Sequence, residues 1–354
     1  MSSHNFKTKI TAMLIVLGVF FLYTRNASAQ MEENNDDLGS ALSFSALSFS
    51  DNGNLNVGVG NASTVSGPPS KQVSSSTIIE LVGAEVGAGG NIVLGNNGLF
   101  SNDVISSDGS ITLDNYTKVL GQCVTNTGGT VTLNTGASCA GGTDSTGNNE
   151  LLGLLSAADN DANNFVCDVF NGSPTESGPA INIPAGQTRA ITLSPGLNFI
   201  DIPSLTLGNS SSLVLSAPSN MSQAMMQRRG ATVVLRVDGL TRIGDGAKVV
   251  LTNGLSARQV VIATQGGISS WGNSSTINGT ILNGQPVPQI KEDLQRATDP
   301  DACTIGSSAT INGALLCEDD ISIGANARIA SMPASAVLVP AVCDDEGSPI
   351  GPKE

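Results

Sequence analysis

Short runs of alternating apolar and polar residues recur along the chain at a nearly constant interval. Three of them begin with a glycine: GNIVLGN (Gly90 to Asn96), GSITLDN (Gly109 to Asn115) and GTVTLNT (Gly129 to Thr135). Their lead glycines lie 19 and 20 residues apart (109 − 90 and 129 − 109). Alternation with period two indicates a strand with one buried face. In the second run we therefore expect Ile111 and Leu113 to point inward and the residues before and between them to face outward.

A second form of the run, an aliphatic pair followed by a glycine, occupies the C-terminal half. Its copies are SLTLGNSSSLVL (Ser204 to Leu215), LTRIGDGAKVVL (Leu240 to Leu251), ISSWGNSSTING (Ile268 to Gly279), CTIGSSATING (Cys303 to Gly313) and ISIGANARIA (Ile321 to Ala330). The glycines after the aliphatic pairs are 36, 28, 34 and 18 residues apart (244 − 208, 272 − 244, 306 − 272 and 324 − 306). These intervals fit one or two coils of about 18 to 20 residues, with insertions.

A repeat of this length predicts an all-β fold, a parallel β-helix or β-solenoid in which each repeat is one coil. One coil offers about four or five inward aliphatic side chains, each contributing roughly 1.5 to 3 kcal/mol when buried. Ordering its backbone costs about 1 to 2 kcal/mol per residue, so a single coil is unstable. Stacked coils share a core and hydrogen-bond both strand edges. The Gly or Asx residues after each run turn the corner, since they tolerate positive φ.

Other segments differ from this pattern and set the expected domain boundaries. LSFSALSFS (Leu42 to Ser50) alternates as a half-buried strand does, and we assign residues 30–73 to an N-terminal strand or cap region with a linker. The solenoid is expected over 74–340, with a helical insertion near 148–170, and a polar tail over 341–354. The insertion contains Asp159, Asp161 and Asn163, but it lacks the glycine and glutamate of a calcium loop. We interpret this tract as a solvated helix end and predict no metal site.

The first 29 residues have the features of a secretory signal peptide. Two lysines precede an apolar run from Ile10 to Tyr23, and Ala27-Ser28-Ala29 follows as a cleavage site. The run has about 14 residues, fewer than the roughly 20 that span a membrane. An uncleaved anchor is the alternative. We expect a secreted or cell-surface protein that is not held in a membrane after cleavage.

Composition excludes several kinds of chemistry in the exported chain. The single histidine, His4, lies in the signal segment, so Ser-His-Asp and Cys-His catalysis and His-ligated zinc are excluded. The formal charge of −14 becomes −17 when Lys7, Lys9 and Arg25 are removed with the signal. Such acidity argues against nucleic acid, whose binding needs Lys and Arg against the phosphates. We predict no cofactor.

Six cysteines, all outside the signal segment, are typical of an oxidising compartment. They allow 15 pairings. The pairs Cys123 with Cys139 and Cys303 with Cys317 lie less than one repeat apart and can meet on neighbouring coils, which leaves Cys167 for Cys343. Zinc binding by thiolates alone is the alternative, although the chain has no C-x-x-C spacing.

Three segments resemble the C-terminal part of secreted microbial ice-binding proteins: Ala231 to Gly267, Ser274 to Leu282 and Ser307 to Ile329. LGSALSFSAL (Leu38 to Leu47) is similar to the opening of that family. The resemblance implies an irregular right-handed β-solenoid with one α-helix packed alongside, here Asn148 to Phe170. The three N-terminal runs are equally similar to the repeats of bacterial polymer-forming and surface-anchor solenoid proteins, whose roles are structural.

Three functions follow as hypotheses. The first is a non-catalytic structural or adhesive protein whose partners are cell-envelope components or further copies of itself, associated end to end or side by side. The second is ice binding through a flat Thr, Ser and Ala face, which Arg242 and Arg328 would interrupt. Its candidate side chains are Thr112, Thr130, Thr132, Thr276, Thr280 and Thr310. The third is a polysaccharide-acting β-helix enzyme, which needs paired carboxylates; the acids are scattered, and we assign no catalytic residue.

Overall fold

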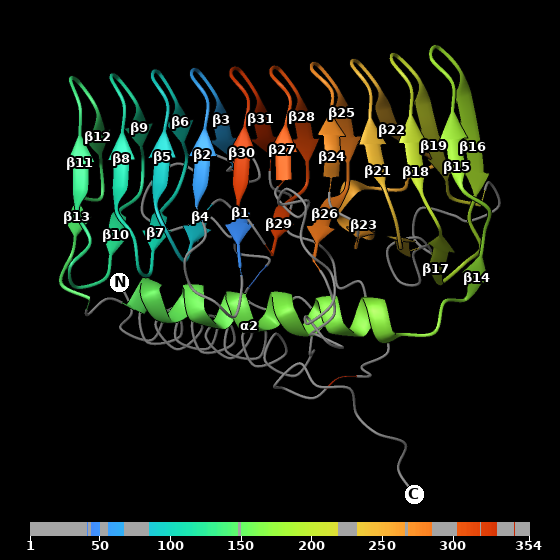
Figure 1. Cartoon of the computed structure of the whole chain (residues 1–354), viewed down its shortest axis with the longest axis horizontal. Coiled ribbons are helices and arrows are strands. Elements are labelled where there is room, and N and C mark those ends of the chain that lie inside the picture. Colours follow the sequence, from blue (N-terminus) through green and yellow to red (C-terminus); the bar gives the residue numbers. More distant parts are fainter. Residues whose placement is uncertain are drawn as a thin grey trace, which may run out of the picture. The chain divides into compact units, whose positions relative to one another are not determined.

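The chain forms a parallel β-solenoid with one long helix along its side, as the sequence predicts (Figure 1). The computed structural model describes residues 41, 44–49, 56–66, 85–147, 150–218, 232–265, 268–284, 303–318, 320–330 and 343. All of them belong to one compact unit, Asp37–Glu354. Every strand pairing among the described residues is parallel, so each coil continues the sheets of its neighbours.

The strands form three faces, listed here in spatial order. The helix face contains β13 (Thr143–Asp144), β10 (Cys123–Thr125), β7 (Val104–Ser106), β4 (Glu85–Ala88), β1 (Phe44–Ser48), β29 (Leu315–Cys317), β26 (Thr280–Asn283), β23 (Val260–Thr264), β20 (Thr232–Val237), β17 (Leu197–Ile202) and β14 (Glu176–Ser177). The front face contains β11 (Val131–Leu133), β8 (Ile111–Leu113), β5 (Ile92–Leu94), β2 (Val57–Val59), β30 (Ile321–Ile323) and β27 (Cys303–Ile305), followed by β24 (Ile268–Trp271), β21 (Thr241–Ile243), β18 (Leu205–Leu207) and β15 (Ile181–Ile183). The third face contains β12 (Ser138–Cys139), β9 (Lys118–Val119), β6 (Leu99–Phe100), β3 (Thr64–Ser66), β31 (Arg328–Ala330), β28 (Thr310–Asn312), β25 (Thr276–Asn278), β22 (Lys248–Thr252), β19 (Ser212–Ser216) and β16 (Thr188–Thr192). A short 3-10 helix, η2 (Ala257–Gln259), precedes β23.

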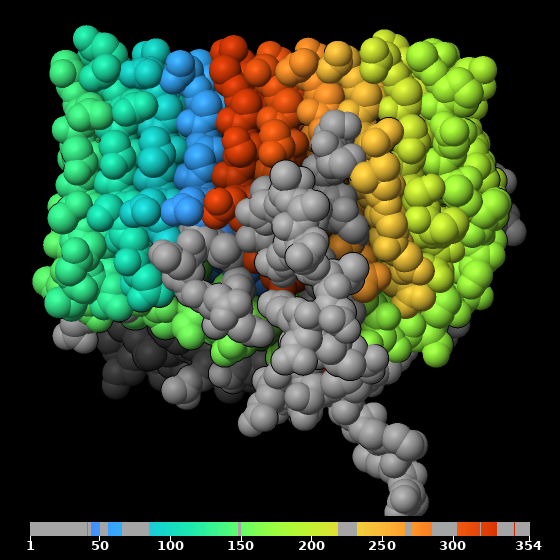
Figure 2. All heavy atoms as spheres, in the orientation of Figure 1, coloured from blue at the N-terminus to red at the C-terminus, as the bar shows by residue number. Residues whose placement is uncertain are grey.

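The coils do not stack in the order of the sequence. From β2 the chain winds outward to one end of the solenoid at β11, β12 and β13. The helix α2 (Glu150–Asn171) then carries the chain to the opposite end, where the coils wind back toward the middle. There β30 and β31 stack on β2 and β3, and β1 lies between β4 and β29. Figure 2 shows the front face in the same orientation, with each coil as one band.

The interior is narrow and filled mainly by aliphatic side chains. Ile111 and Leu113 are fully buried there, as expected, and pair in register with Val131 and Leu133 of the next coil. Trp271 takes an inward position, in register with Ile243 of the adjacent coil. Corner glycines allow the coils to approach closely. A Cβ on one of them, Gly272, would lie 2.2 Å from the backbone carbon of Gly244.

A second apolar core lies between α2 and the helix face. The helix buries one side at the three- and four-residue spacing of an amphipathic helix. Leu155, Ala158, Ala162, Phe165 and Val169 are the buried apolar residues at this spacing. At about 1.5 Å per residue the helix spans roughly 33 Å, or about seven rungs of about 4.8 Å. The Asp159–Asn163 tract lies in the middle of this helix, so its interpretation as a helix end was wrong.

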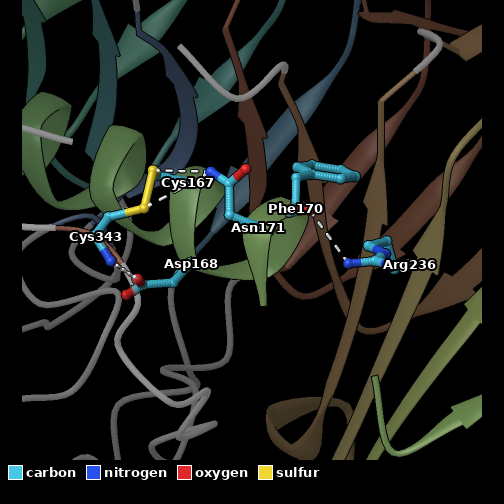
Figure 3. Close-up of a disulfide and its surroundings, with 6 residues drawn as sticks. All are labelled: Cys167, Asp168, Phe170, Asn171, Arg236 and Cys343. Atoms are coloured by element: carbon cyan, nitrogen blue, oxygen red, sulfur yellow. Dashed lines mark hydrogen bonds between the residues drawn. A yellow bond between two sulfur atoms is a disulfide. The ribbon is translucent and has the colours of Figure 1, made fainter. Parts of the chain in front are cut away.

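The C-terminal end of α2 is anchored to the solenoid by Arg236 of β20. Its Nη1 donates hydrogen bonds to the carbonyl oxygens of Val169 (3.1 Å), Phe170 (3.3 Å) and Gly172 (2.9 Å). Its Nε forms ion pairs with Asp201 (3.0 Å) and Asp238 (3.3 Å). A buried guanidinium thus satisfies carbonyls that a helix end leaves without a partner (Figure 3).

The three disulfides join the pairs that the sequence spacing favours: Cys123–Cys139, Cys303–Cys317 and Cys167–Cys343. The first two connect strands of different faces less than one turn apart, rather than equivalent positions on neighbouring coils. The third ties α2 to Cys343, whose backbone N–H also donates to Oδ1 of Asp168 at 2.9 Å (Figure 3). Three disulfides are typical of an oxidising compartment.

We expect the long-range disulfide to contribute more stability than a short-range one. Cys167–Cys343 spans 176 residues and Cys303–Cys317 spans 14, and all four cysteines are buried. By loop-closure entropy, replacing the first pair with alanines lowers the free energy of unfolding by about 2 kcal/mol more than replacing the second pair. Urea unfolding of the two double variants measures this difference. Equal losses, or a larger loss for the short loop, would contradict the expectation.

One expectation about the N-terminal region was wrong. All five residues of β1 are buried, although their alternation predicted a half-buried strand, because the interior covers one side and α2 the other. The strands β2 and β3 form a coil in the middle of the solenoid. The linker expected at Gly67 to Gln72 lies outside the described residues. The signal segment, residues 1–29, and all of the tail except Cys343 lie outside the described residues. Within the described residues, no helix is long and apolar enough to span a membrane.

Candidate functional site

One row of outward positions on the front face consists of small uncharged residues. Each front-face strand in this stretch has three residues, and the middle one points away from the interior, because the residues on either side of it hold inward positions. These inward residues are buried in every strand of the stretch except the terminal β11. Strand pairing places the middle residues of six neighbouring coils in register. We call this row the outer column; in spatial order it is Thr304, Ser322, Gly58, Val93, Thr112 and Thr132.

Two ladders of side-chain to backbone hydrogen bonds, one on each side of the strands, help to fix the spacing of the outer column from Ser322 to Thr132. On the side before the strands, Oδ1 of Asp320 accepts from the Asn56 N–H (2.6 Å) and Oδ1 of Asn56 accepts from the Asn91 N–H (2.9 Å). The same ladder continues through Ser110 and Thr130. Such bonds hold each coil at one height relative to the next, so the column repeats about every 4.8 Å.

The second ladder runs along the corner that follows the strands. Oδ1 of Asn61 accepts from the Asn96 N–H at 2.9 Å, and Oδ1 of Asn96 accepts from the Asn115 N–H at 3.1 Å. The same corner residue in other coils makes equivalent bonds; for example, Oδ1 of Asp245 accepts from the Asn273 N–H at 2.7 Å. The third residue of this corner has positive φ in coil after coil, including Asn97 and Ser274. Asn, Ser and Gly therefore recur here because of backbone geometry and stacking.

The other two faces are less suited to present a neutral repeating surface. The corresponding row of the third face contains Lys118, Arg328 and Lys248, all exposed. The helix face packs under α2 and exposes little of its outer side. On the front face, Arg242 of β21 is exposed, but it lies outside the outer column, beyond β24. Arg242 and Arg328, expected to interrupt one surface, thus lie on different faces.

The structure divides the six predicted threonines among all three faces. Thr112 and Thr132 belong to the outer column, and Thr130 lies beside it in the ladder. Thr276 and Thr310 are paired on the third face. Thr280 lies on the helix face and is only 1% exposed, so it is not available to a surface partner.

Sequence reasoning missed the other members of the outer column. Thr304 and Ser322 occupy the position two residues before the corner glycine, in the sequences CTIG and ISIG. Aligning the runs on that glycine would have found both residues. Gly58 and Val93 carry no hydroxyl, and a search for threonine could not find them.

Acidic side chains of the described residues serve mainly structural contacts. Asp201 and Asp238 flank Arg236 at the end of the helix. Burial raises the pKa of the Asp238 carboxyl above its ordinary value; the Asp201 carboxylate raises this pKa further, and Arg236 lowers it. Asp320 accepts the ladder hydrogen bond from Asn56, while Asp319, Asp344 and Asp345 lie outside the described residues. Among the described residues, no three His, Cys, Asp or Glu side chains are grouped to hold a metal ion.

The chain aligns over most of its length with solved structures of ice-binding proteins. One, from the Antarctic ascomycete Antarctomyces psychrotrophicus, is 15% identical, with a TM-score of 0.43 over 83% of this chain and 97% of that one. Another, from an Arctic yeast, is 15% identical, with a TM-score of 0.42 over 86% and 100%. A third, from an Antarctic Flavobacteriaceae bacterium, is 12% identical, with a TM-score of 0.36 over 82% and 81%. No protein-family model and no curated protein matches the chain. At these identities the similarity concerns the arrangement of the backbone.

Proposed function

We propose that this chain is a secreted ice-binding protein and that its outer column is part of the surface that contacts ice. The observation that carries the proposal is the register of six small, uncharged residues on adjacent coils. Export is supported by the signal-like N-terminal segment and by the three disulfides.

A rigid row suits a periodic partner. The outer column lies along the surface of a sheet, whereas sites for small molecules are concave. Parallel backbone pairing joins all six coils, and the two ladders add side-chain bonds that keep the spacing constant from Ser322 to Thr132. A partner that meets many coils at once must therefore have a regular surface of its own, as a crystalline solid does.

The chemistry of the column favours ice among such solids. A mineral surface of ions needs a row of charges, and the column has none. A crystalline polysaccharide is bound by exposed aromatic rings, and the column contains no ring. Threonine and serine hydroxyls both donate hydrogen bonds to water and accept them, and the methyl groups of threonine and valine hold no water tightly. Ice is the periodic solid that such side chains can meet without losing strongly bound water.

The proposal is tested by cooling the purified protein with a single ice crystal in a nanolitre osmometer. We expect faceted crystals and a gap between the melting and freezing temperatures. Round crystals that grow at the melting point, as in buffer alone, would refute the proposal. Concentration-dependent fibres or attachment to cell surfaces in that case would favour the structural or adhesive role.

A further inference from the structure

Among the described residues, no element covers the interior at the end of the solenoid formed by β11, β12 and β13; we call this end the open end. Val131 and Leu133 hold inward positions there, because they pair with the fully buried Ile111 and Leu113. Leu133 is nevertheless 42% exposed, and Val131 is partly exposed. The inner side chains of this coil therefore lie at the surface, beside strand edges that pair with no further strand of the described part of the chain.

The opposite end of the solenoid is protected. Arg189 of β16 pairs in register with Leu213, which is fully buried, so an arginine occupies an inward position and is exposed. A charge at an inward position of a terminal strand opposes pairing with another chain. The inward residues of β15, Ile181 and Ile183, are buried, in contrast to Leu133.

Charge also distinguishes the open end. The full chain carries a formal charge of −14, which opposes the approach of two copies. Residues 126–147 form the coil at the open end. They contain a single ionisable side chain, Asp144, apart from the disulfide-bonded Cys139. Contact between two open ends therefore brings few charged side chains of the two copies together.

We infer that a second copy of the chain covers the open end, with β11 of one copy pairing antiparallel to β11 of the other about a two-fold axis at Thr132. The protected end excludes a head-to-tail chain, and a two-fold interface uses the same surface on both copies. Among the three terminal strands, β11 has three residues, whereas β12 and β13 have two. Pairing through β13 instead would bring two Asp144 carboxylates together.

This geometry has a consequence that rests on the proposed function. A two-fold axis that passes between the two β11 strands beside Thr132, perpendicular to the front face, maps that face onto itself. The outer columns of the two copies then lie in one plane and form a single row of double length. A dimer would therefore present twice as many coils to one ice surface, and its avidity would exceed that of either copy alone.

Dimerisation is tested in the absence of ice, so that the result is independent of the proposed function. In sedimentation equilibrium we expect the wild-type protein at twice the mass of one chain. Leu133→Lys should sediment as a monomer, because it places a charge in the apolar contact, opposite Val131 of the other copy. Leu240→Lys, which replaces a leucine that is 38% exposed away from the open end, should remain a dimer. A monomeric wild type, or a dimeric Leu133→Lys, would overturn the inference.

Cross-linking tests the arrangement without disturbing the core. Thr132 is exposed at the proposed axis, so two Thr132→Cys side chains face each other at about 4.5–5.5 Å between Cα atoms, within the reach of a disulfide. Mild oxidation should convert this variant to a covalent dimer. Thr112→Cys, one coil further in, would be separated from its copy by about 14 Å and should stay uncross-linked. Equal cross-linking of the two variants, or none in Thr132→Cys, would exclude the β11 pairing.

Discussion

Replacing Thr304 by glutamate is expected to reduce thermal hysteresis at least about tenfold, since each 1.4 kcal/mol or so of lost binding is one factor of ten. Thr304 is the exposed middle residue of β27, in register with Ser322 of the next coil. A carboxylate there must give up strongly bound water before ice can approach, and that loss costs several kcal/mol. The side chain points away from the interior, so the fold should tolerate the change with a loss within about 0.5 kcal/mol.

Thr310→Glu is the matched control for this substitution. Thr310 belongs to the same coil but lies on the third face, beside Arg328. Thr310→Glu changes the net charge by the same amount as Thr304→Glu. We expect its thermal hysteresis to stay within about twofold of the wild type, since surface changes away from a binding face have little effect. Equal loss of activity in the two variants would show that charge alone, or the third face, decides the effect.

Replacing Arg236 by methionine is expected to lower the free energy of unfolding by about 3–5 kcal/mol, the usual cost of breaking a buried ion pair. The substitution leaves Asp201 without its partner and removes the donor from three carbonyl oxygens at the end of α2. Methionine fills a similar volume, so the loss reports the charge and the hydrogen bonds rather than a cavity.

Arg242→Met provides the comparison for this stability measurement. Arg242 follows β20 in the chain but is exposed on the front face, where its loss should change stability within about 0.5 kcal/mol. Urea unfolding followed by circular dichroism measures both variants. A loss below about 1 kcal/mol for Arg236→Met would mean that the end of α2 does not depend on the guanidinium, since one ordinary hydrogen bond contributes that much.

The structure of a single coil could be predicted from the sequence, because it depends on local chemistry. The period of 19 and 20 residues and the inward Ile111 and Leu113 follow from alternation. The corner glycines follow from positive φ or from the close approach of neighbouring coils, and the pairs Cys123–Cys139 and Cys303–Cys317 follow from their short separation. Each of these features is decided within one or two coils.

The order of the coils could not be predicted in the same way. The residues Val57 to Val59 pair with Ile92 to Leu94 on one side and with Ile321 to Ile323 on the other. All three segments present the same aliphatic pattern, so the pattern does not say which coils become neighbours. The helix that returns the chain and the strand β1 in the middle of a sheet decide the order.

The candidate site depends on that order and was therefore only partly predicted. Thr112 and Thr132 lie in the N-terminal coils, whereas Thr304 and Ser322 lie about 200 residues later in the chain. These four residues form one column only because β30, near the C-terminal end of the chain, pairs with β2, near its N-terminal end. Choosing residues by type alone also selected Thr280. This residue is buried because of its position in the coil.

The central claim, that the outer column contacts ice, is tested most directly by competition in one tube. Equal amounts of wild-type protein, Thr304→Glu and Thr310→Glu are mixed, ice is grown slowly from the solution, and the proteins in the melted ice are counted by mass spectrometry after proteolysis. We predict that the ice is enriched in the wild-type protein and Thr310→Glu and that Thr304→Glu remains in the liquid. Equal amounts of the three proteins in the ice, or exclusion of all three from it, would contradict the claim.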